Sequence, residues 1–277
     1  MTRLSRPFAA LSGAADFFLN VLYPPRCMGC GSFLTISHGL SRLSPEQALT
    51  LLGTGDFARL LAGWLCPPCR ESLSPVTQPF CTSCGEEFKS RVGSDHLCGA
   101  CAADPPPFDR ARSVFFYEEA LAFAIQSMKY RGRMELGRPL GLVFADAFLR
   151  HFSEDPPDFA VPVPLHHKRL RKRGANQVVL LVADWAKFSG FTPLVPEALK
   201  RLRPTPAQAS LDRAHRAANV RKAFAVKRPE LVAGKKILLL DDVFTTGATS
   251  RECAKVLKKA GAARVDVLTL ARVAAGI

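Results

Sequence analysis

An aliphatic run leads directly into two aspartates and a glycine turn in KKILLLDDVFTTGATS, residues 235–250. The unbroken run at 237–240 predicts a strand covered on both faces, as in a parallel sheet between two layers of helices. Residues 247–262 then have the pattern of a helix, which Gly261 closes. A buried strand, a tight turn and a helix in this order predict one unit of an α/β fold.

Strand and helix patterns alternate over the whole second half of the chain. A strand begins near residue 112, and further strand patterns cover 160–164, 235–242 and 264–273. Helical patterns cover the end of 112–133, about 135–151, 174–190 and 247–262. This alternation predicts the α/β class with a mainly parallel sheet. Ligands of such sheets bind beyond the carboxyl ends of the strands, which is where Asp241 and Asp242 lie.

The first half of the chain carries eight cysteines in four Cys-x-x-Cys pairs: Cys27/Cys30, Cys66/Cys69, Cys81/Cys84 and Cys98/Cys101. Two residues between cysteines let one tight turn direct both sulfur atoms at a single ion, and two such turns complete a tetrahedral thiolate site. The pairs therefore predict two structural Zn²⁺ ions in a double zinc ribbon, in preference to disulfides or a redox motif. Sites filled by four thiolates hold a fold together and leave no position open for catalysis.

The sequence predicts the four turns more clearly than it predicts which two turns share one zinc ion. Cys81/Cys84 with Cys98/Cys101 makes a ribbon of ordinary length, whereas Cys27/Cys30 with Cys66/Cys69 must span an insertion at 31–65. Within that insertion, SPEQALTLL (44–52) predicts a helix capped by Ser44 and Gln47. An interleaved pairing of the four turns stays possible. The ninth cysteine, Cys253, lies in a predicted helix, where we expect a packed side chain.

A proline-rich joint, ADPPPFDRA at 103–111, divides the chain. We expect an amphipathic helix at 1–22, the double zinc ribbon with its helical insertion at 23–104, and the α/β domain at 108–277. We also expect that removal of zinc unfolds 27–101 and leaves 108–277 largely folded. No apolar stretch is long enough to span a membrane, and 1–22 has no continuous apolar core of an export signal. The sequence therefore predicts a cytoplasmic protein with reduced cysteines.

Positive charge is concentrated in one part of the chain. The net charge is +14, and residues 162–230 alone hold 15 Lys/Arg against 4 Asp/Glu. This excess favours an anionic partner, either a phosphate-rich small molecule or a nucleic acid. The segment has few aromatic residues to stack bases, which weakens the case for direct binding of single strands through it.

The turn after the buried strand suits an anion next to a sugar. Successive backbone N–H groups and the start of a helix form an anion cradle, and Thr245, Thr246 and Thr249 add hydroxyl donors. Asp241 and Asp242 would repel a phosphate, so we expect them to accept hydrogen bonds from a vicinal diol. A diol beside a phosphate predicts a 5-phosphoribosyl group as the ligand.

Five features of the sequence together resemble the competence protein F (ComF) family. LLLDDVFTTGAT (238–249) is similar to the phosphoribosyl pyrophosphate motif of type I phosphoribosyltransferases. YEEALAFAIQSMKYRG (117–132), VPVPLHHKRLRKRGANQ (161–177), RPTPAQASLDRAHRAANVRKAF (203–224) and the cysteine ribbons extend the likeness over nearly the whole chain except 31–65. The resemblance implies a type I phosphoribosyltransferase fold after a double zinc ribbon.

The resemblance also implies roles for particular residues. Asp241 and Asp242 would hold the ribose hydroxyls. The 5′-phosphate would be held by Thr245, Thr246, Gly247, Ala248 and Thr249. At the position of Ala248, many transferases have a second glycine. The pyrophosphate, which arrives with Mg²⁺, would be contacted by His166, Lys168, Arg169 and Arg173. A mobile hood would contribute Arg203, Gln208, Arg216 and Asn219.

Two functions follow from the resemblance. In the first, the chain binds phosphoribosyl pyrophosphate and acts in natural competence, with single-stranded DNA and a DNA-translocating helicase as partners. In the alternative, it is an active phosphoribosyltransferase that transfers ribose 5-phosphate to an acceptor in nucleotide metabolism. Such a transfer needs orientation and charge balance more than a nucleophile, so no catalytic residue can be named from the sequence.

Overall fold

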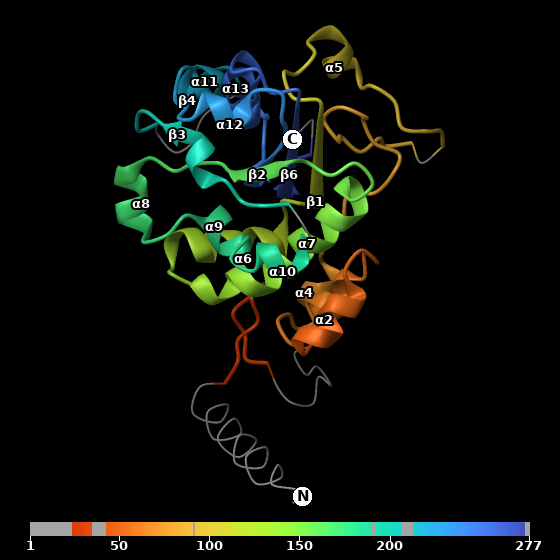
Figure 1. Cartoon of the computed structure of the whole chain (residues 1–277). Coiled ribbons are helices and arrows are strands. Elements are labelled where there is room, and N and C mark those ends of the chain that lie inside the picture. The colour runs from red at the N-terminus through yellow and green to blue at the C-terminus, as the bar shows by residue number, and fades with distance from the viewer. Residues whose placement is uncertain (1–23, 35–42, 91, 190–191, 206–212, 275–277) are drawn as a thin grey trace, which may run out of the picture.

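The computed structural model describes residues 24–34, 43–90, 92–189, 192–205 and 213–274 (Figure 1). The helix expected at 1–22 lies outside these described residues. The centre of the structure is one sheet with helices on both faces, which confirms the predicted α/β class. Within the described residues, every helix is too short or too polar to cross a membrane.

Four parallel strands form the central sheet in the order β1-β6-β5-β2. Their bounds are β1 Arg110–Phe116, β2 Phe159–Pro162, β5 Lys236–Phe244 and β6 Arg264–Arg272. Residues 237–240 of the central strand β5 are completely buried. The aliphatic run is therefore the doubly covered strand that the sequence predicts, and Asp241 and Asp242 follow it directly.

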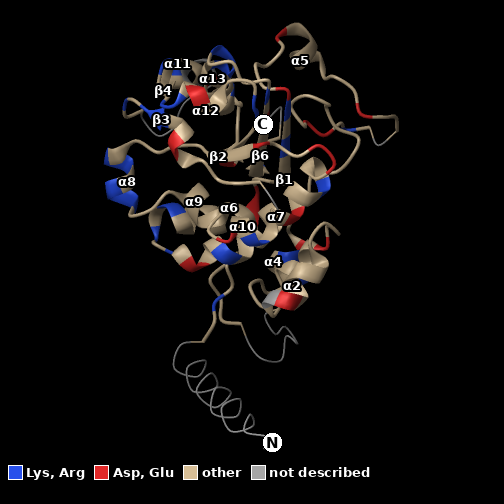
Figure 2. Cartoon of the chain, viewed as in Figure 1, with Lys and Arg blue, Asp and Glu red and all other residues tan. Residues whose placement is uncertain are grey.

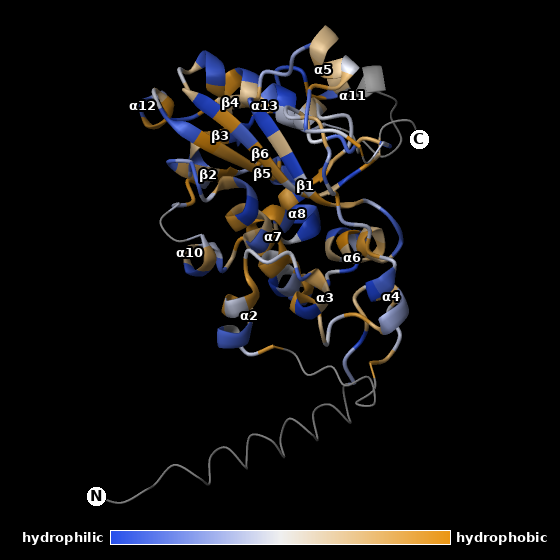
Figure 3. Cartoon of the chain, turned by 90° about the vertical axis from the view of Figure 1, so that its right-hand side faces the viewer, coloured by the Kyte–Doolittle hydropathy of each residue, from blue (hydrophilic) through white to orange (hydrophobic). Residues whose placement is uncertain are grey.

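Two hydrophobic cores lie on the two faces of the sheet, because alternate residues of a strand point to opposite sides. Leu238 and Leu240 belong to one core, and Ile237 and Leu239 belong to the other. Figure 3 shows the hydrophobic residues concentrated where the helices meet the strands. The first layer holds η2 Met134–Leu136, α6 Glu119–Tyr130, α7 Gly137–Phe152, α9 Gln177–Leu181 and α10 Trp185–Phe188. The second layer holds α11 Arg213–Val220, α12 Pro229–Val232 and α13 Ala248–Lys259.

The chain between β2 and β5 differs from its prediction in two places. The helix expected over 174–190 is divided into α9 and α10, and the backbone of α9 lies so close to α7 that a Cβ on Gly141 would be 2.4 Å from the oxygen of Leu181. A two-stranded antiparallel sheet of β3 (Leu199–Arg201) and β4 (Phe224–Val226) covers part of the second layer, with the 3-10 helix η3 (Pro196–Ala198) before β3 and α11 between the two strands. Strands of three residues are too short for an alternating pattern to reveal.

The cysteine-rich segment packs on both sides of the sheet. Helices α2 (Pro45–Leu51), α3 (Phe57–Leu60) and α4 (Pro67–Glu71) lie beside α6 and α7, and α5 (Gly99–Ala103) lies on the opposite side near α13 (Figure 1). The predicted cap of α2 is confirmed: Ser44 Oγ accepts from Gln47 N at 3.2 Å, and Gln47 Oε1 accepts from Ser44 N at 2.9 Å.

The first ribbon shares a hydrophobic core with the α/β sheet. The rings of Phe57 and Phe115 have centroids 4.7 Å apart, across the two halves of the chain. The buried carboxylate of Asp146 on α7 accepts from the backbone N–H groups of Gly53 and Gly55 at 2.8 Å and 3.1 Å. The predicted boundary at 104–108 falls between α5 and β1, but packing continues across it.

The second ribbon covers the outer edge of β1, which would otherwise be the open edge of the sheet. Val76 N donates to Val114 O at 2.9 Å, and Ala111 N donates to Ser83 O at 2.6 Å. Gly85 in the ribbon lies against β1 so closely that a Cβ there would be 2.5 Å from Ala111 O. An unpaired strand edge is thereby covered by another part of the same chain.

Candidate functional site

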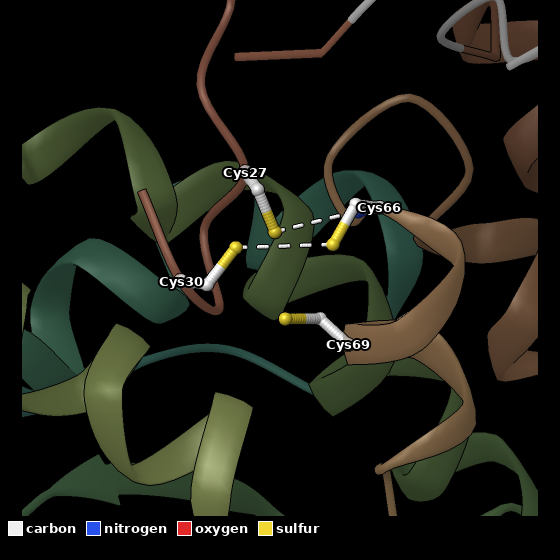
Figure 4. A group of neighbouring side chains, drawn as sticks. All are labelled: Cys27, Cys30, Cys66 and Cys69. Atoms are coloured by element: carbon white, nitrogen blue, oxygen red, sulfur yellow. Dashed lines mark hydrogen bonds between the residues drawn. The ribbon is translucent and has the colours of Figure 1, made fainter. Parts of the chain in front are cut away.

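Both predicted cysteine tetrads assemble in the structure, and in each group the four sulfur atoms lie within 4.8 Å of one another. The first tetrad is Cys27, Cys30, Cys66 and Cys69 (Figure 4), and the second is Cys81, Cys84, Cys98 and Cys101. The structure therefore confirms the sequential pairing of the four turns and excludes the interleaved one. The 31–65 insertion lies between the two turns of the first tetrad.

The geometry of each tetrad fits a tetrahedral zinc ion. The sulfur atoms of Cys30 and Cys66 are 3.8 Å apart, as are those of Cys84 and Cys98. A regular tetrahedron with Zn–S bonds of about 2.3 Å has edges of about 3.8 Å. The backbone N–H of Cys66 donates to Cys27 Sγ at 3.3 Å, as expected for a sulfur that carries negative charge. Zinc held by such a set would be structural, because all four positions come from the protein.

A cavity of about 550 Å³ lies at the carboxyl end of β5. Its wall combines acidic, hydroxyl and basic side chains that the sequence predicts for a ligand site: Asp241, Asp242, Thr245, Thr249, Arg169 and Arg173. The first four follow the buried part of β5, and the two arginines lie on α8 (His167–Arg173). The sheet thus brings together residues that are about seventy positions apart in the sequence.

The two neighbouring aspartates have different surroundings. Asp242 Oδ2 forms an ion pair with Lys129 Nζ at 2.8 Å, and both side chains are 16% exposed. Asp241 Oδ1 accepts from the backbone N–H of Asp242 at 2.9 Å. Burial, together with the negative charge of Asp242, raises the pKa of Asp241 to about 7, although Lys129 and Arg201 act in the opposite direction. One carboxylate is therefore neutralised by a lysine, whereas the other is costly to ionise.

The turn at residues 245–249, which we call the phosphate turn, requires glycine at its centre. Gly247 has φ 72° and ψ 4° and precedes α13, so the first N–H groups of this helix face the turn. A Cβ on Gly247 would be only 2.7 Å from Cζ of Phe244. The hydroxyl of Thr246 is buried and lacks a hydrogen-bond partner among the described residues. Ala248, the first residue of α13, is buried. The unpaired hydroxyl of Thr246 and the positive end of the helix fit a phosphate group.

The basic residues predicted for pyrophosphate are not all in this cavity. Arg169 and Arg173 line it, and Arg173 donates to Gln177 Oε1 at 2.9 Å. His166 and Lys168 instead line a smaller neighbouring cavity of about 220 Å³. His166 caps α8, because its Nδ1 accepts from the backbone N–H of Lys168 at 3.3 Å. Burial and the neighbouring His167 lower the pKa of His166, which suits a neutral ring that accepts a hydrogen bond.

The residues predicted for the hood either lie apart from the cavity or fall outside the described residues and side chains. Gln208 lies outside the described residues, and Arg216 lies within α11 without a described side chain. Asn219 also lies in α11. Arg203 donates to Arg221 O at 2.7 Å and is exposed.

Sequence reasoning missed two basic residues that contact the aspartates or lie beside them. Lys129 comes from the end of α6, and Arg201 comes from β3; both line the cavity. Arg201 is half-buried, its Nε has no hydrogen-bond partner among the described residues, and its guanidinium lies 5.1 Å from the ring centroid of Phe224. No local pattern pointed to Lys129, the one basic residue of α6. Arg201 could not be distinguished in the sequence from the many other basic residues of 162–230.

Charge on the molecule follows this arrangement. Figure 2 shows Lys and Arg side by side along α8, and further basic residues on β3. These elements lie near the carboxyl ends of the strands, where the cavity opens. Cys253, by contrast, is fully buried in α13, as predicted for a packed side chain.

Comparison with protein families agrees with this architecture. The family model described as a double zinc ribbon domain matches residues 60–102, and the phosphoribosyl transferase domain matches residues 140–277. The fold, the tetrads and the cavity together define a protein of the phosphoribosyltransferase fold that carries a double zinc ribbon.

Relatives narrow the assignment from this class to one family. The chain is 32% identical to "Competence protein F" of Haemophilus influenzae over 75% of this chain and 90% of that protein. It is 32% identical to "DNA utilization protein YhgH" of Escherichia coli strain K12, over 76% and 92%. "Competence protein ComFC" of Bacillus subtilis is 30% identical, over 75% and 84%. The chain belongs to the competence protein F family.

Proposed function

We propose that the chain binds phosphoribosyl pyrophosphate with Mg²⁺ in the cavity at the end of β5, and that this binding serves natural competence. The observation that carries the proposal is the meeting of three kinds of groups in one cavity: a carboxylate pair, a glycine turn before a helix, and two arginines. These groups match a ribose diol, a 5′-phosphate and a pyrophosphate, respectively. The relatives' names, which refer to competence and DNA utilization, support the second part.

Each group would have a separate task in binding. Asp241 and Asp242 would accept hydrogen bonds from the ribose hydroxyls, and the phosphate turn would donate to the 5′-phosphate. Arg169 and Arg173 lie across the cavity, where they can offset the charge of the pyrophosphate. Mg²⁺, which prefers oxygen ligands and keeps part of its water shell, would arrive on the pyrophosphate and reduce its charge. Thiolate ligands need reduced cysteines, so we propose the cytoplasm as the location.

Titration calorimetry with phosphoribosyl pyrophosphate and Mg²⁺ tests the proposal. We expect saturable binding, because the cavity supplies donors for both phosphate groups and acceptors for the diol. Ribose 5-phosphate, which lacks the pyrophosphate, is expected to bind more weakly. Absence of saturable heat with phosphoribosyl pyrophosphate would refute the proposed binding.

One observation favours the alternative of an active transferase. Burial raises the pKa of Asp241 to about 7, a value at which a carboxylate can take a proton near neutral pH. A residue of this kind beside the ribose could accept a proton from an incoming acceptor. Release of pyrophosphate in the presence of nucleobases or DNA measures this activity. Binding without release above background would leave the chain as a non-catalytic binder.

A second cavity supports contact with single-stranded DNA at a place that the sequence did not indicate. This cavity of about 570 Å³ lies between the first ribbon and α6. Arg26, Arg131 and Arg133 line it together with Trp64 and Phe123. The guanidinium of Arg131 lies 4.9 Å from the ring centroid of Phe123. Arginines that pair with phosphates, beside rings that stack on bases, are the usual means of binding a single strand.

Arg131→Gln is expected to weaken binding of an oligothymidine strand and to lower its dependence on salt. Each lost phosphate contact reduces the slope of log affinity against log salt by about 0.7 for single strands. Fluorescence anisotropy at several salt concentrations measures both quantities. Arg228→Gln is the matched control, because Arg228 pairs with Glu230 at 2.8 Å on α12, away from this cavity. Equal slopes for both variants and the unchanged protein would contradict this location.

A further inference from the structure

Arg272, the last residue of β6, joins the second cysteine tetrad to the sheet. The residue is 2% exposed, and its Nη1 donates to the carbonyl oxygen of Cys84 at 3.0 Å. Its Nη2 forms an ion pair with the carboxylate of Glu86, whose side chain is 20% exposed. A buried arginine of this kind depends on its carboxylate partner, because removal of Glu86 leaves the guanidinium charge without compensation.

The same guanidinium also contacts the end of β5. Its carbon lies 5.6 Å from the ring centroid of Phe244, a cation–π distance. Arg272 and Phe244 are paired in the sheet, and Val273 N donates to Phe244 O at 2.9 Å. The position of Phe244 is therefore set by the end of β6, which the second ribbon in turn contacts.

Phe244 supports the phosphate turn directly. Its ring is packed against Gly247, since a Cβ there would be 2.7 Å from Cζ and 3.3 Å from both Cε atoms. Phe244 is 7% exposed, and Phe108 packs edge-on against it at a centroid distance of 6.1 Å. The ring cannot shift without moving the turn, because close-packed interiors transmit displacements.

We propose that the second cysteine tetrad positions the phosphate turn through Glu86, Arg272 and Phe244, so that metal binding in the tetrad and phosphate binding at the turn favour each other. The inference rests on the proposed binding of phosphoribosyl pyrophosphate. These three residues are positioning residues, because they reach the phosphate only through Gly247. Thermodynamic linkage requires the effect to be reciprocal: the phosphate compound must strengthen retention of the metal by the same factor.

Glu86→Gln tests the first direction, with Glu87→Gln as its matched control. Both glutamates lie in the same ribbon, but Glu86 pairs with Arg272, whereas Glu87 Oε2 accepts from the backbone N–H of Thr77 at 2.7 Å. We expect Glu86→Gln to weaken binding of phosphoribosyl pyrophosphate about tenfold in calorimetry, and Glu87→Gln to leave it within about twofold. Phe244→Leu keeps the site apolar and is expected to act as Glu86→Gln does.

Thiol labelling during zinc chelation tests the reverse direction. Mass spectrometry distinguishes the two tetrads, because it measures the labelling of each cysteine separately. Phosphoribosyl pyrophosphate is expected to slow the labelling of Cys84 and Cys98 in the unchanged protein. The same protection is expected to be lost in Glu86→Gln. A residue with a purely structural role would lower thermal stability without moving either the affinity or this protection.

The results separate this inference from the proposed function. If the unchanged protein binds no phosphoribosyl pyrophosphate, the proposed function fails, and the inference fails with it. If the unchanged protein binds but Glu86→Gln and Phe244→Leu bind equally well, only the inference is overturned. Should Glu86→Gln fail to fold, Phe244→Leu and the labelling of the unchanged protein still decide the question.

Discussion

Asp241→Asn and Asp242→Asn are expected to shift the stability of the ligand-free protein in opposite directions, although both weaken binding of phosphoribosyl pyrophosphate. The two residues are neighbours and the chemical change is the same. Their surroundings differ, since Asp242 is paired with Lys129 at 2.8 Å and Asp241 has no ion pair at that distance among the described residues. Each variant therefore serves as the control for the other, because the same chemical change is made in a different environment.

Asp241→Asn is expected to stabilise the protein above neutral pH. The folded-state pKa is raised to about 7 from an ordinary value of 3.8, so folding favours the protonated form. Stability contributed by that form is present at low pH and is lost as pH rises toward 7. Asparagine removes this cost and keeps an oxygen for the N–H of Asp242. We expect a gain of about 1–3 kcal/mol in unfolding free energy at pH 8.

Asp242→Asn is expected to destabilise the protein, because Lys129 then lacks the carboxylate that compensates its buried charge. Removing one partner of a buried pair costs about 3–5 kcal/mol, and partial exposure of this pair places the expected loss at about 1–3 kcal/mol. Thermal unfolding at pH 8 measures both variants. Shifts of the same sign would contradict the difference in environment.

Both variants are expected to weaken binding by about 10- to 100-fold, since each removes a charged acceptor for a ribose hydroxyl. In the unchanged protein the affinity should rise with pH through about 7, because the diol needs the ionised form of Asp241. The titration of the phosphate compound itself adds to this slope. Asp241→Asn isolates that contribution, and its pH profile is expected to be flatter. Identical profiles would show that Asp241 does not titrate on binding.

Removal of zinc is expected to unfold both halves of the chain in one transition. The sequence suggested independent halves, but the first ribbon and the sheet share one core, and the second ribbon is hydrogen-bonded to β1. A structural zinc ion supplies about 10 kcal/mol or more of apparent folding free energy, which is comparable to the entire stability of a domain. Because the core is shared, loss of the zinc-bound ribbon also removes packing contacts from the sheet and destabilises it.

The two tryptophans report the two halves separately. Trp64 lies in the first ribbon, and Trp185 packs against Phe148 of α7 with ring centroids 4.9 Å apart. Trp64→Phe and Trp185→Phe each leave one fluorophore, whose emission is followed during titration with a chelator. We expect coincident midpoints. A native signal from Trp185 after loss of the Trp64 signal would show that the halves are independent.

The sequence predicted those parts of the structure that rest on local patterns. The aliphatic run before Asp241 predicted a buried strand, and the spacing of the cysteines predicted both tetrads. These features depend on neighbours in the chain, or on one tight turn. The tight turn around Gly247 could be predicted for the same reason, because it depends only on the backbone freedom of the glycine.

Other parts depend on contacts between distant segments. Lys129 pairs with a residue more than a hundred positions away, and no local pattern indicates such a partner. His166 is predicted as a pyrophosphate ligand from its place in a basic run, and its capping of α8 was not indicated by that pattern. The strands β3 and β4 have three residues each, so pairing and not pattern creates them. The shared core of the ribbon and the sheet likewise exists only after both have folded.

The covered edge of β1 has a consequence for cells that lack metal. Residues 74–83 occupy backbone groups that would otherwise be free to pair with a second molecule. A chain that emerges from the ribosome without zinc cannot form this cover, so the apolar segment that becomes β1 stays exposed, and exposed segments of this kind pair with one another into aggregates. Metal starvation should then appear first as insoluble protein.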